Sequence, residues 1–236
     1  MPYLPGRCRF DEGHFQLPNT FTLDHIRATA TKIFVWVVWA HVLLAAGVAL
    51  IGRNSWREPA AIAAAIAVVA TLAAWKMRDG LALRSIMAVC LTFGPILFVY
   101  AGRGHFSGMA GNGDWQIDYH MYFFGMFAML AAYIDWRVIA VSAALTAGHH
   151  LLLDLVLPAN VFPEEGIDRV ALHALAVVIE CGVLFWLTRA VAALFRRLED
   201  LVDFTSRETA EALTREMEAN AALREQLHHH LSATPT

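Results

Sequence analysis

The sequence is poor in charge, and this scarcity is the first indication of its class. Charged residues make up 17% of the 236 residues, and the formal net charge is only −3, whereas soluble domains carry about 25% charged residues. The chain has no excess of positive charge to attract a nucleic-acid backbone, so we expect no nucleic-acid partner. Hydrophobic residues make up 58% and the mean hydropathy is +0.48, which is typical of an integral membrane protein.

Cysteine and the common catalytic motifs are also scarce. The three cysteines, Cys8, Cys90 and Cys181, form no CxxC pair, so the sequence predicts neither a disulfide framework nor a cysteine-based zinc site. P-loop, GxSxG and kinase motifs are missing, which argues against the common soluble chemistries. The first apolar run begins near residue 33, after a polar stretch without a cleavage-site pattern. We therefore expect no removable signal peptide.

Long apolar runs are what the sequence does have. A helix needs about 20 apolar residues to cross a bilayer, and the candidates are Ile33–Ile51, Ala60–Trp75, Leu81–Ala101, Gln116–Ile134, Val138–Leu157 and Val170–Leu194. Arg84 lies near one end of the third run, where its side chain could snorkel to the headgroups, and Gly94–Pro95 predicts a kink there. The predicted fold class is all-α, an integral membrane bundle of about six transmembrane helices with a C-terminal cytoplasmic helix.

Positive charge is concentrated on one side of the predicted spans. That side carries Arg27, Lys32, Lys76, Arg78, Arg137, Arg189, Arg196 and Arg197. Cytoplasmic segments are the ones enriched in Lys and Arg, so we expect a multi-pass membrane protein with both termini in the cytoplasm. The chain then divides into a cytoplasmic arm (1–31), a transmembrane domain (32–195) and a cytoplasmic helix (196–236).

The C-terminal segment contains neither proline nor glycine from Arg196 to about Leu231, which predicts a charged helix. One heptad register places apolar residues on a single seam, namely Ala210, Leu213, Met217, Leu227 and Leu231. Such a seam predicts a homodimeric coiled coil. Asn220 and Arg224 interrupt it, however, so a solvated single helix is the alternative.

Histidines lie at similar depths in the last three runs. At a rise of about 1.5 Å per residue, His120, His149, His150 and His173 fall within one or two turns of each other near the outer face. Ionisable groups in a bilayer cost roughly 2–3 kcal/mol each, so several at one depth indicate a built site. Three imidazoles from three helices are a common way to bind zinc or copper.

The position of Asp154 indicates which of the adjacent histidines, His149 or His150, is the metal ligand. His149 and His150 point about 100° apart on a helix, so one can bind a metal while the other packs or forms a hydrogen bond. Asp154 lies one turn beyond His150 on the same face, where it would orient the ring or add an oxygen ligand. We therefore favour His150 as the ligand.

A second, deeper layer consists of Glu180 and His41. Glu180 is seven residues from His173, hence on the same stripe but about 10 Å deeper, and His41 lies midway along the first run at nearly the same depth. We expect Glu180 to be buried and to form a hydrogen bond with His41 or another polar group, and we expect both residues to contact a bound cofactor.

A haem is the alternative cofactor. Two histidines from different helices can hold one within a bundle, and Gly125, Gly148 and Gly182 would leave room for the macrocycle. Close helix packing is the other explanation of these glycines, and the one that we favour. Met109 and Met121 lie near the outer histidines and would suit copper(I).

The segment DYHMYFFGMFAMLAAYIDWRVIAVSAALTAGHHLLLDLVLP, followed by LHALAVVIECGVLFWL, resembles the multi-span sensory region at the N-terminus of some bacterial methyl-accepting chemotaxis proteins and diguanylate cyclases. The family pattern runs acidic-x-His-Phe, Tyr-x-Asp-Trp, His-His, then Leu-His and a Glu one stripe below. Its residues here are Asp118, His120, Tyr133, Asp135, Trp136, His149, His150, His173 and Glu180. The chain departs from the pattern with Met121 in place of Phe and with Asp118 in place of the commoner Glu. The resemblance covers roughly residues 33–195 and implies a signal receptor of the bacterial inner (cytoplasmic) membrane.

Together these features predict a transmembrane sensor domain rather than an enzyme. The outer histidines would bind a copper or zinc ion or a metal-containing cofactor, and the last span would pass the signal to a cytoplasmic output domain or protein, as in chemotaxis. The alternative is a small membrane haem protein or a His-metal oxidoreductase. The long helix after Arg197 favours the sensor, because a receptor needs such a helix and a catalytic membrane domain does not.

Overall fold

A computed structural model describes most of the chain. The described residues are 10–11, 14–15, 22–102, 115–156 and 167–232. Within these ranges the side chains of 10–11, 14–15, 115–117, 153–156, 167–170, 227 and 229–232 are not described. His105 and Met109 therefore lie outside the described residues, as does the side chain of Asp154.

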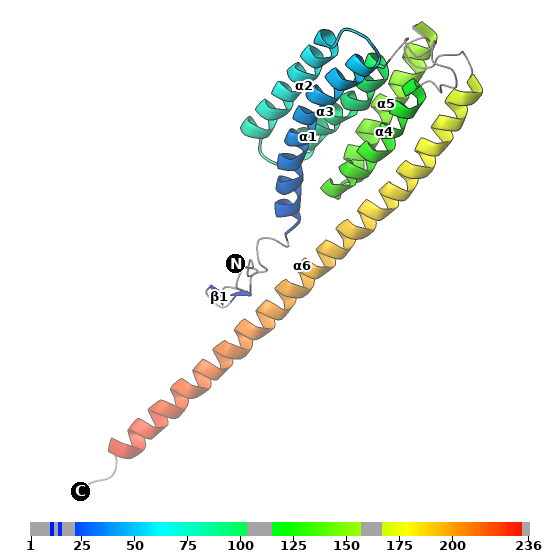
Figure 1. Cartoon of the computed structure of the whole chain (residues 1–236). Coiled ribbons are helices and arrows are strands. Elements are labelled where there is room, and N and C mark those ends of the chain that lie inside the picture. The colour runs from blue at the N-terminus through cyan, green and yellow to red at the C-terminus, as the bar shows by residue number, and fades with distance from the viewer. Residues whose placement is uncertain (1–9, 12–13, 16–21, 103–114, 157–166, 233–236) are drawn as a thin grey trace. The chain divides into compact units, whose positions relative to one another are not determined.

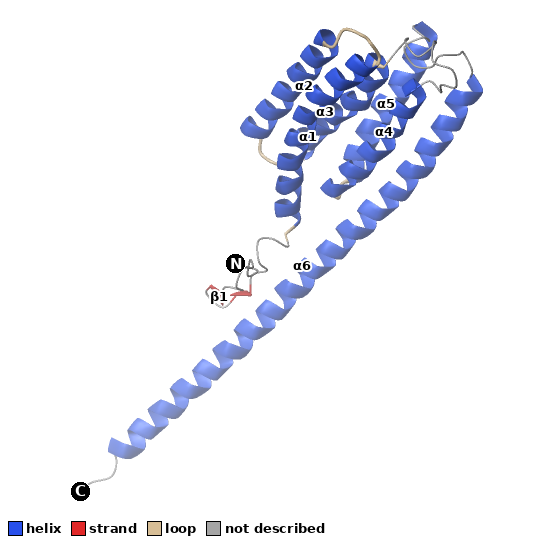
Figure 2. Ribbon diagram, in the orientation of Figure 1, coloured by secondary structure: helices blue, strands red, loops and turns tan. Residues whose placement is uncertain are grey.

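Helices account for nearly all of the described residues (Figure 2). They are α1 (Leu23–Ile51), α2 (Arg57–Lys76), α3 (Leu81–Ala101), α4 (Trp115–Leu130), the short 3₁₀ helix η2 (Ala131–Tyr133), α5 (Trp136–Val156) and α6 (Ile167–Ser232). Two strands of two residues each, β1 (Phe10–Asp11) and β2 (His14–Phe15), pair antiparallel in the N-terminal arm. The predicted all-α class is confirmed.

Four of the described helices are long and apolar enough to cross a membrane. These are α1, α2, α3 and α6 from Ala171 onward. They match the first, second, third and sixth predicted runs, although α1 begins ten residues earlier than its run. The predicted fourth and fifth spans correspond to α4, which has 16 residues, and α5, and neither is among the four within the described part of the chain. The predicted count of six spans is therefore not confirmed.

Residues Leu23–Ala192 form one compact unit, and α3 is its central helix. It packs against α1, α2, α4 and α5, which Figure 1 shows grouped side by side. Two thirds of its apolar stretch (67%) is buried, against 28% for α1. The short helix α2 approaches closely through alanines three or four residues apart (Ala60, Ala63, Ala67, Ala70 and Ala73), all of them buried, as small residues allow at helix contacts in membranes.

A buried ion pair joins α3 to the turn before α5. Arg84 Nη1 lies 2.9 Å from Asp135 Oδ2, and only 8% and 3% of these side chains are exposed. Arg84 therefore does not snorkel, because a carboxylate meets it inside the bundle. Arg137 also donates to Asp135, through Nε at 2.9 Å and Nη2 at 3.1 Å. Burial alone would raise the pKa of Asp135, but hydrogen bonds from Arg137 and the charges of both arginines outweigh it and lower that pKa.

The same turn is also attached to α1. Arg27 Nε donates to the Tyr133 carbonyl at 3.0 Å, and the hydroxyls of Thr31 and Tyr133 lie 3.0 Å apart. Ile134, in the turn itself, has a positive φ of 50°, a conformation that a β-branched residue rarely adopts. These contacts hold the ends of α1, α3 and α5 that lie nearest this turn together.

The second unit comprises residues 1–22 and 193–236, and α6 provides most of it. The helix is continuous through Ser232, as the absence of proline and glycine predicts. Leu213 and Met217 of the predicted seam are 51% and 64% exposed, so their apolar surface has no partner within the described part of this chain. A coiled coil is not confirmed.

Candidate functional site

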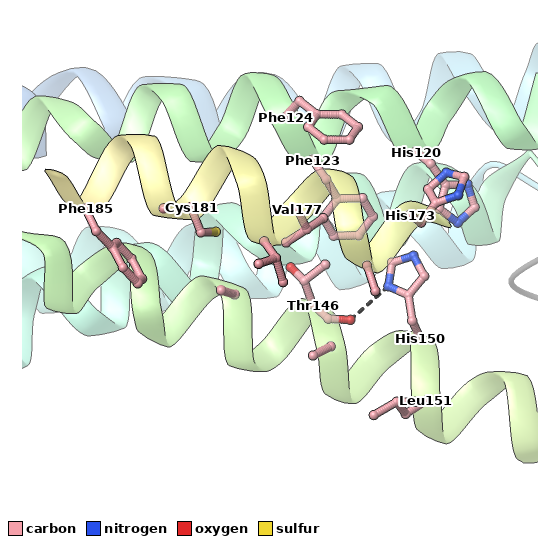
Figure 3. A pocket seen from close by; sticks show the side chains of 15 residues that line it. His120, Phe123, Phe124, Thr146, His150, Leu151, His173, Val177, Cys181 and Phe185 are labelled. Carbon is pink, nitrogen blue, oxygen red and sulfur yellow. Dashed lines mark hydrogen bonds between the residues drawn. The ribbon is translucent and has the colours of Figure 1, made fainter. Parts of the chain in front are cut away.

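Three of the predicted histidines lie together. His120 comes from α4, His150 from α5 and His173 from α6. Their ring centroids are 5.4 Å (His120–His150), 5.8 Å (His120–His173) and 6.4 Å (His150–His173) apart, and Figure 3 shows the three rings at one end of a cavity. The structure therefore brings the three predicted histidines close together, each from a different helix.

These separations are close to those of a three-histidine metal site. Imidazoles on one tetrahedral metal, with metal–nitrogen bonds of about 2.0–2.1 Å, have ring centroids about 5 Å apart. The observed triangle is wider by up to about 1 Å, and no trio of His, Cys, Asp or Glu side chains in the described residues is arranged as a metal site. Rotation about χ2 turns the ring nitrogens but leaves the centroids almost in place, so binding of one ion by all three rings would require changes in χ1 or a small shift of a helix.

His150 is held in the orientation and tautomer that a metal ligand needs. Its Nδ1 lies 2.8 Å from the Thr146 carbonyl oxygen, which can only accept, so Nδ1 carries the proton. In the neutral ring Nε2 then presents a lone pair, as in metal sites where a backbone carbonyl orients the histidine. We predicted Asp154 in this role. The carbonyl of Thr146, one turn before His150, also accepts from this ring, and the Asp154 side chain lies outside the described residues.

His149 faces a different direction from His150, as adjacent helical residues should. Its ring stacks on Phe123, with centroids 6.0 Å apart and planes 30° apart, and makes an edge contact with His150 at 5.1 Å. His149 is 8% exposed, and its Nε2 has no hydrogen-bond partner among the described residues. His149 does not line the cavity.

A haem between His150 and His173 would conflict with His120. The three separations place the His120 ring about 5 Å from the midpoint of the other two, close to the plane that an axially ligated macrocycle would occupy. His120 is also 1% exposed, so it cannot swing away without disturbing the packing. This arrangement fits a metal ion better than a haem.

The cavity extends from the histidines along α4, α5 and α6, with a volume of about 530 Å³. Its walls are mostly apolar and consist of His120, Phe123, Phe124, Ala143, Thr146, Ala147, His150, Leu151, His173, Ala174, Val177, Val178, Cys181, Gly182 and Phe185. In Figure 3, Cys181 and Phe185 lie toward the end opposite the histidines. The sequence analysis missed Thr146 and the aromatic walls. The spacing of four residues between Thr146 and His150 could have indicated that the two lie one helical turn apart.

The deeper layer is built differently from the prediction. His41 does not bond to Glu180. Its Nε2 lies 3.0 Å from the Tyr122 hydroxyl, and its ring makes an edge contact with Phe98 at 5.4 Å. A methyl group on Gly94 would overlap the His41 ring, so α3 needs glycine there. Similar depth did not make His41 and Glu180 partners, because His41 lies on α1, which packs against α2 and α3.

Glu180 is half-buried on α6, and its Oε2 atom is buried without a hydrogen-bond partner among the described residues. It does not line the cavity. Met121, which we considered for copper(I), is 62% exposed and also lies outside the cavity wall. The structure therefore adds neither residue to the histidine cluster.

The three glycines considered for a macrocycle do not mark close helix contacts. A Cβ atom at Gly125, Gly148 or Gly182 would meet nothing within 4 Å, so the favoured packing explanation was wrong for the described structure. Only Gly182 of the three lines the cavity, and its missing side chain widens the cavity.

Comparisons of the chain with protein-family models, curated proteins and solved structures find no match.

Proposed function

We propose that this chain is the sensory module of a bacterial inner-membrane signal receptor, in which His120, His150 and His173 bind a copper or zinc ion. The convergence of three imidazoles from three helices is the observation that carries the proposal. The contact of His150 Nδ1 with the Thr146 carbonyl supports it, since it leaves Nε2 as the nitrogen that would bind the ion. Imidazole suits both metals, and none of the described methionines lines the cavity to favour copper(I).

The proposed module crosses the membrane six times, with α4 and α5 as the two additional spans and both termini in the cytoplasm. An even number of spans places the arm and the C-terminal helix on the same side, and the distribution of Lys and Arg makes that side cytoplasmic. This topology puts the histidine end of the cavity near the outer face. The resemblance to the sensory regions of chemotaxis receptors and diguanylate cyclases points to the same arrangement.

Signal transfer in this proposal uses α6. His173 is the only one of the three proposed ligands on α6, so a shared ion would tie α6 to α4 and α5. A ligand shifts an equilibrium only by binding two states differently, and an ion that needs all three rings favours the state in which α6 is docked. The same helix continues beyond the predicted span, where it would act on a cytoplasmic output domain or protein.

The C-terminal part of α6 would form a parallel homodimer. Leu213 and Met217 are exposed apolar residues that a partner helix would cover, together with Leu227 and Leu231 of the same heptad register. Cysteine cross-linking of single-cysteine variants across residues 206–226 tests this arrangement. Bridging that peaks every three to four residues supports the seam, and uniform or absent bridging contradicts it.

Metal content of the purified protein tests the site. Three adjacent histidines, His228–His230, could bind metal themselves, so all variants are made in a background with glutamine at these positions. We expect about one zinc or copper ion per chain by elemental analysis after dialysis. His150→Ala should abolish it, whereas His25→Ala, at an exposed position on α1, should not. Unchanged metal content in His150→Ala and His173→Ala would refute the site. An intense violet absorption band would show that the bound cofactor is a haem rather than a zinc or copper ion.

A further inference from the structure

The cavity is much larger than the proposed metal site requires. An ion would occupy only the histidine end, whereas the cavity of about 530 Å³ falls within the range of roughly 300–1,000 Å³ typical of small-molecule sites. Figure 3 shows Phe123, Thr146 and Val177 around its middle and Phe185 toward the far end. The part of the cavity beyond the histidines therefore has room for a separate ligand.

Thr146 supplies an unused polar group to this part of the cavity. It lines the wall and is 2% exposed, yet its hydroxyl has no hydrogen-bond partner among the described residues. Seven other helical threonines donate to the carbonyl four residues earlier: Thr31, Thr71, Thr92, Thr188, Thr205, Thr209 and Thr214. Thr146 does not make this bond. A buried hydroxyl without a partner costs about 1–3 kcal/mol, which a ligand acceptor would recover.

The rest of the wall determines the shape of the ligand. Aromatic rings of Phe123, Phe124 and Phe185 line the cavity, and Ala174 and Gly182 leave space between them. Phenylalanine faces and edges favour contact with another ring. A linear acyl chain would fill part of the space but could not accept a hydrogen bond from Thr146.

The rim indicates where the ligand comes from. Leu151 and Val178 belong to the cavity wall and are 57% and 67% exposed, so the mouth is bordered by side chains that would face lipid. Among the residues whose side chains the structure describes, no Asp, Glu, Lys or Arg lines the cavity. A molecule that enters from the bilayer into such a cavity must be neutral, because a buried charge without a partner is costly.

We propose that this cavity binds a neutral, membrane-soluble ring compound with a carbonyl oxygen, such as a quinone, and that the Thr146 hydroxyl donates a hydrogen bond to that oxygen. The site lies beside the proposed metal ligands and shares their helices, so the ring compound is a second ligand of the same module. Its binding does not require the metal.

Two probes of equal shape test the hydrogen bond. Duroquinone is a neutral, fully methylated quinone without a free ring position for thiols such as Cys181 to attack. Durene has the same methylated ring without oxygens. Both are titrated calorimetrically into the metal-free full chain in lipid nanodiscs, with titrations of empty nanodiscs subtracted. We expect duroquinone to bind more tightly than durene.

Substitutions then locate the contact. Thr146→Val should weaken duroquinone binding by about three- to tenfold and leave durene unchanged, and Thr146→Ser should restore the affinity. Thr92→Val is the matched control, because the Thr92 hydroxyl is fully buried and bonded to Ser142 and does not line the cavity. It should leave both affinities unchanged.

Substitutions that fill the cavity provide a second test of the proposed binding site. A Cβ atom at Gly182 or at Gly125 would meet nothing within 4 Å, but only Gly182 lines the cavity. Gly182→Leu should abolish binding of both probes, and Gly125→Leu should not. Equal binding of the two probes with no effect of Thr146→Val would overturn carbonyl recognition. Absent binding, or binding insensitive to Gly182→Leu, would assign the cavity to lipid chains and overturn the proposal.

Metal analysis of the same samples separates this inference from the proposed function. If the chain binds duroquinone but takes up no zinc or copper, the ring-compound site is supported and the proposed metal site is refuted. If the chain binds metal but not duroquinone, the metal site is supported and the ring-compound site is refuted.

Discussion

Replacing Asp135 with asparagine should destabilise the fold more than any exposed ion-pair substitution. The Asp135 side chain is 3% exposed and accepts from Arg84 at 2.9 Å and from Arg137 at 2.9 Å. Removing one partner of a buried pair typically costs about 3–5 kcal/mol, because the remaining charge is buried without compensation. After Asp135→Asn, that remaining charge is Arg84, whose side chain is 8% exposed.

The surroundings of Arg84 and Arg137 place the loss of stability in Asp135→Asn at the lower end of the range of about 3–5 kcal/mol. Arg84 keeps Asp79, whose carboxylate lies 3.4 Å from its Nε and is 27% exposed, and it still donates to the Gly80 carbonyl at 3.2 Å. Arg137 is 50% exposed and can turn to water. We therefore expect Asp135→Asn to lower the free energy of unfolding by about 3 kcal/mol.

Unfolding by SDS in mixed micelles, followed by circular dichroism, measures this loss. Glu211→Gln is the control, because its pair with Arg215 is exposed on both sides (68% and 76%) and should contribute less than about 0.5 kcal/mol. The double variant Asp135→Asn with Arg84→Met should recover much of the stability, since the charges that lose a partner, Asp79 and Arg137, are 27% and 50% exposed and can be hydrated. A loss below about 1 kcal/mol in Asp135→Asn, or no coupling in the double variant, would refute the buried-pair reasoning.

Three further predictions follow from the same contacts. Gly94→Ala should cost about 1–3 kcal/mol because its methyl group would overlap the His41 ring, whereas Gly47→Ala, where a Cβ meets nothing within 4 Å, should be tolerated in the same unfolding assay. Tyr122→Phe should cost about 1 kcal/mol because it removes the hydroxyl that pairs with His41 Nε2; an unchanged unfolding midpoint would contradict this bond. The lowered pKa of Asp135 contributes stability that is present above its unfolded pKa of about 3.9 and is lost as the pH falls through the folded value; acid unfolding curves of wild type and Asp135→Asn should converge below that pH.

Depth along the helices could be predicted from the sequence, and neighbours across helices could not. The rise per residue is fixed, so the level of His120, His150 and His173 followed from counting, and the rings do meet. Depth does not tell which helices are adjacent. His41 and Glu180 were predicted to lie at nearly the same depth, yet His41 bonds to Tyr122.

Buried polar partners were the other failure of the sequence analysis. Arg84 near a span end was assigned to the headgroups because its distance from the membrane surface permits that, but Asp135 is 51 residues away in the chain and meets it in the core. The missing backbone bond of Thr146 depends on a side-chain rotamer, which the sequence does not specify. The His150 acceptor, by contrast, is only one turn away, and a helix always offers that carbonyl.

The distribution of contacts within the unit Leu23–Ala192 bears on how the proposed sensor would work. Helices α1, α3 and α5 are joined through the buried charges of Arg84 and Asp135 and the bonds of Arg27, so a ligand would have to disrupt strong contacts to move them. On α6, Leu172, Val178 and Trp186 are between 67% and 70% exposed, and it contributes one wall of the cavity. A ligand acts only through contacts that differ between two states. Occupancy of the cavity would therefore change the position of α6 more readily than the positions of α1, α3 and α5.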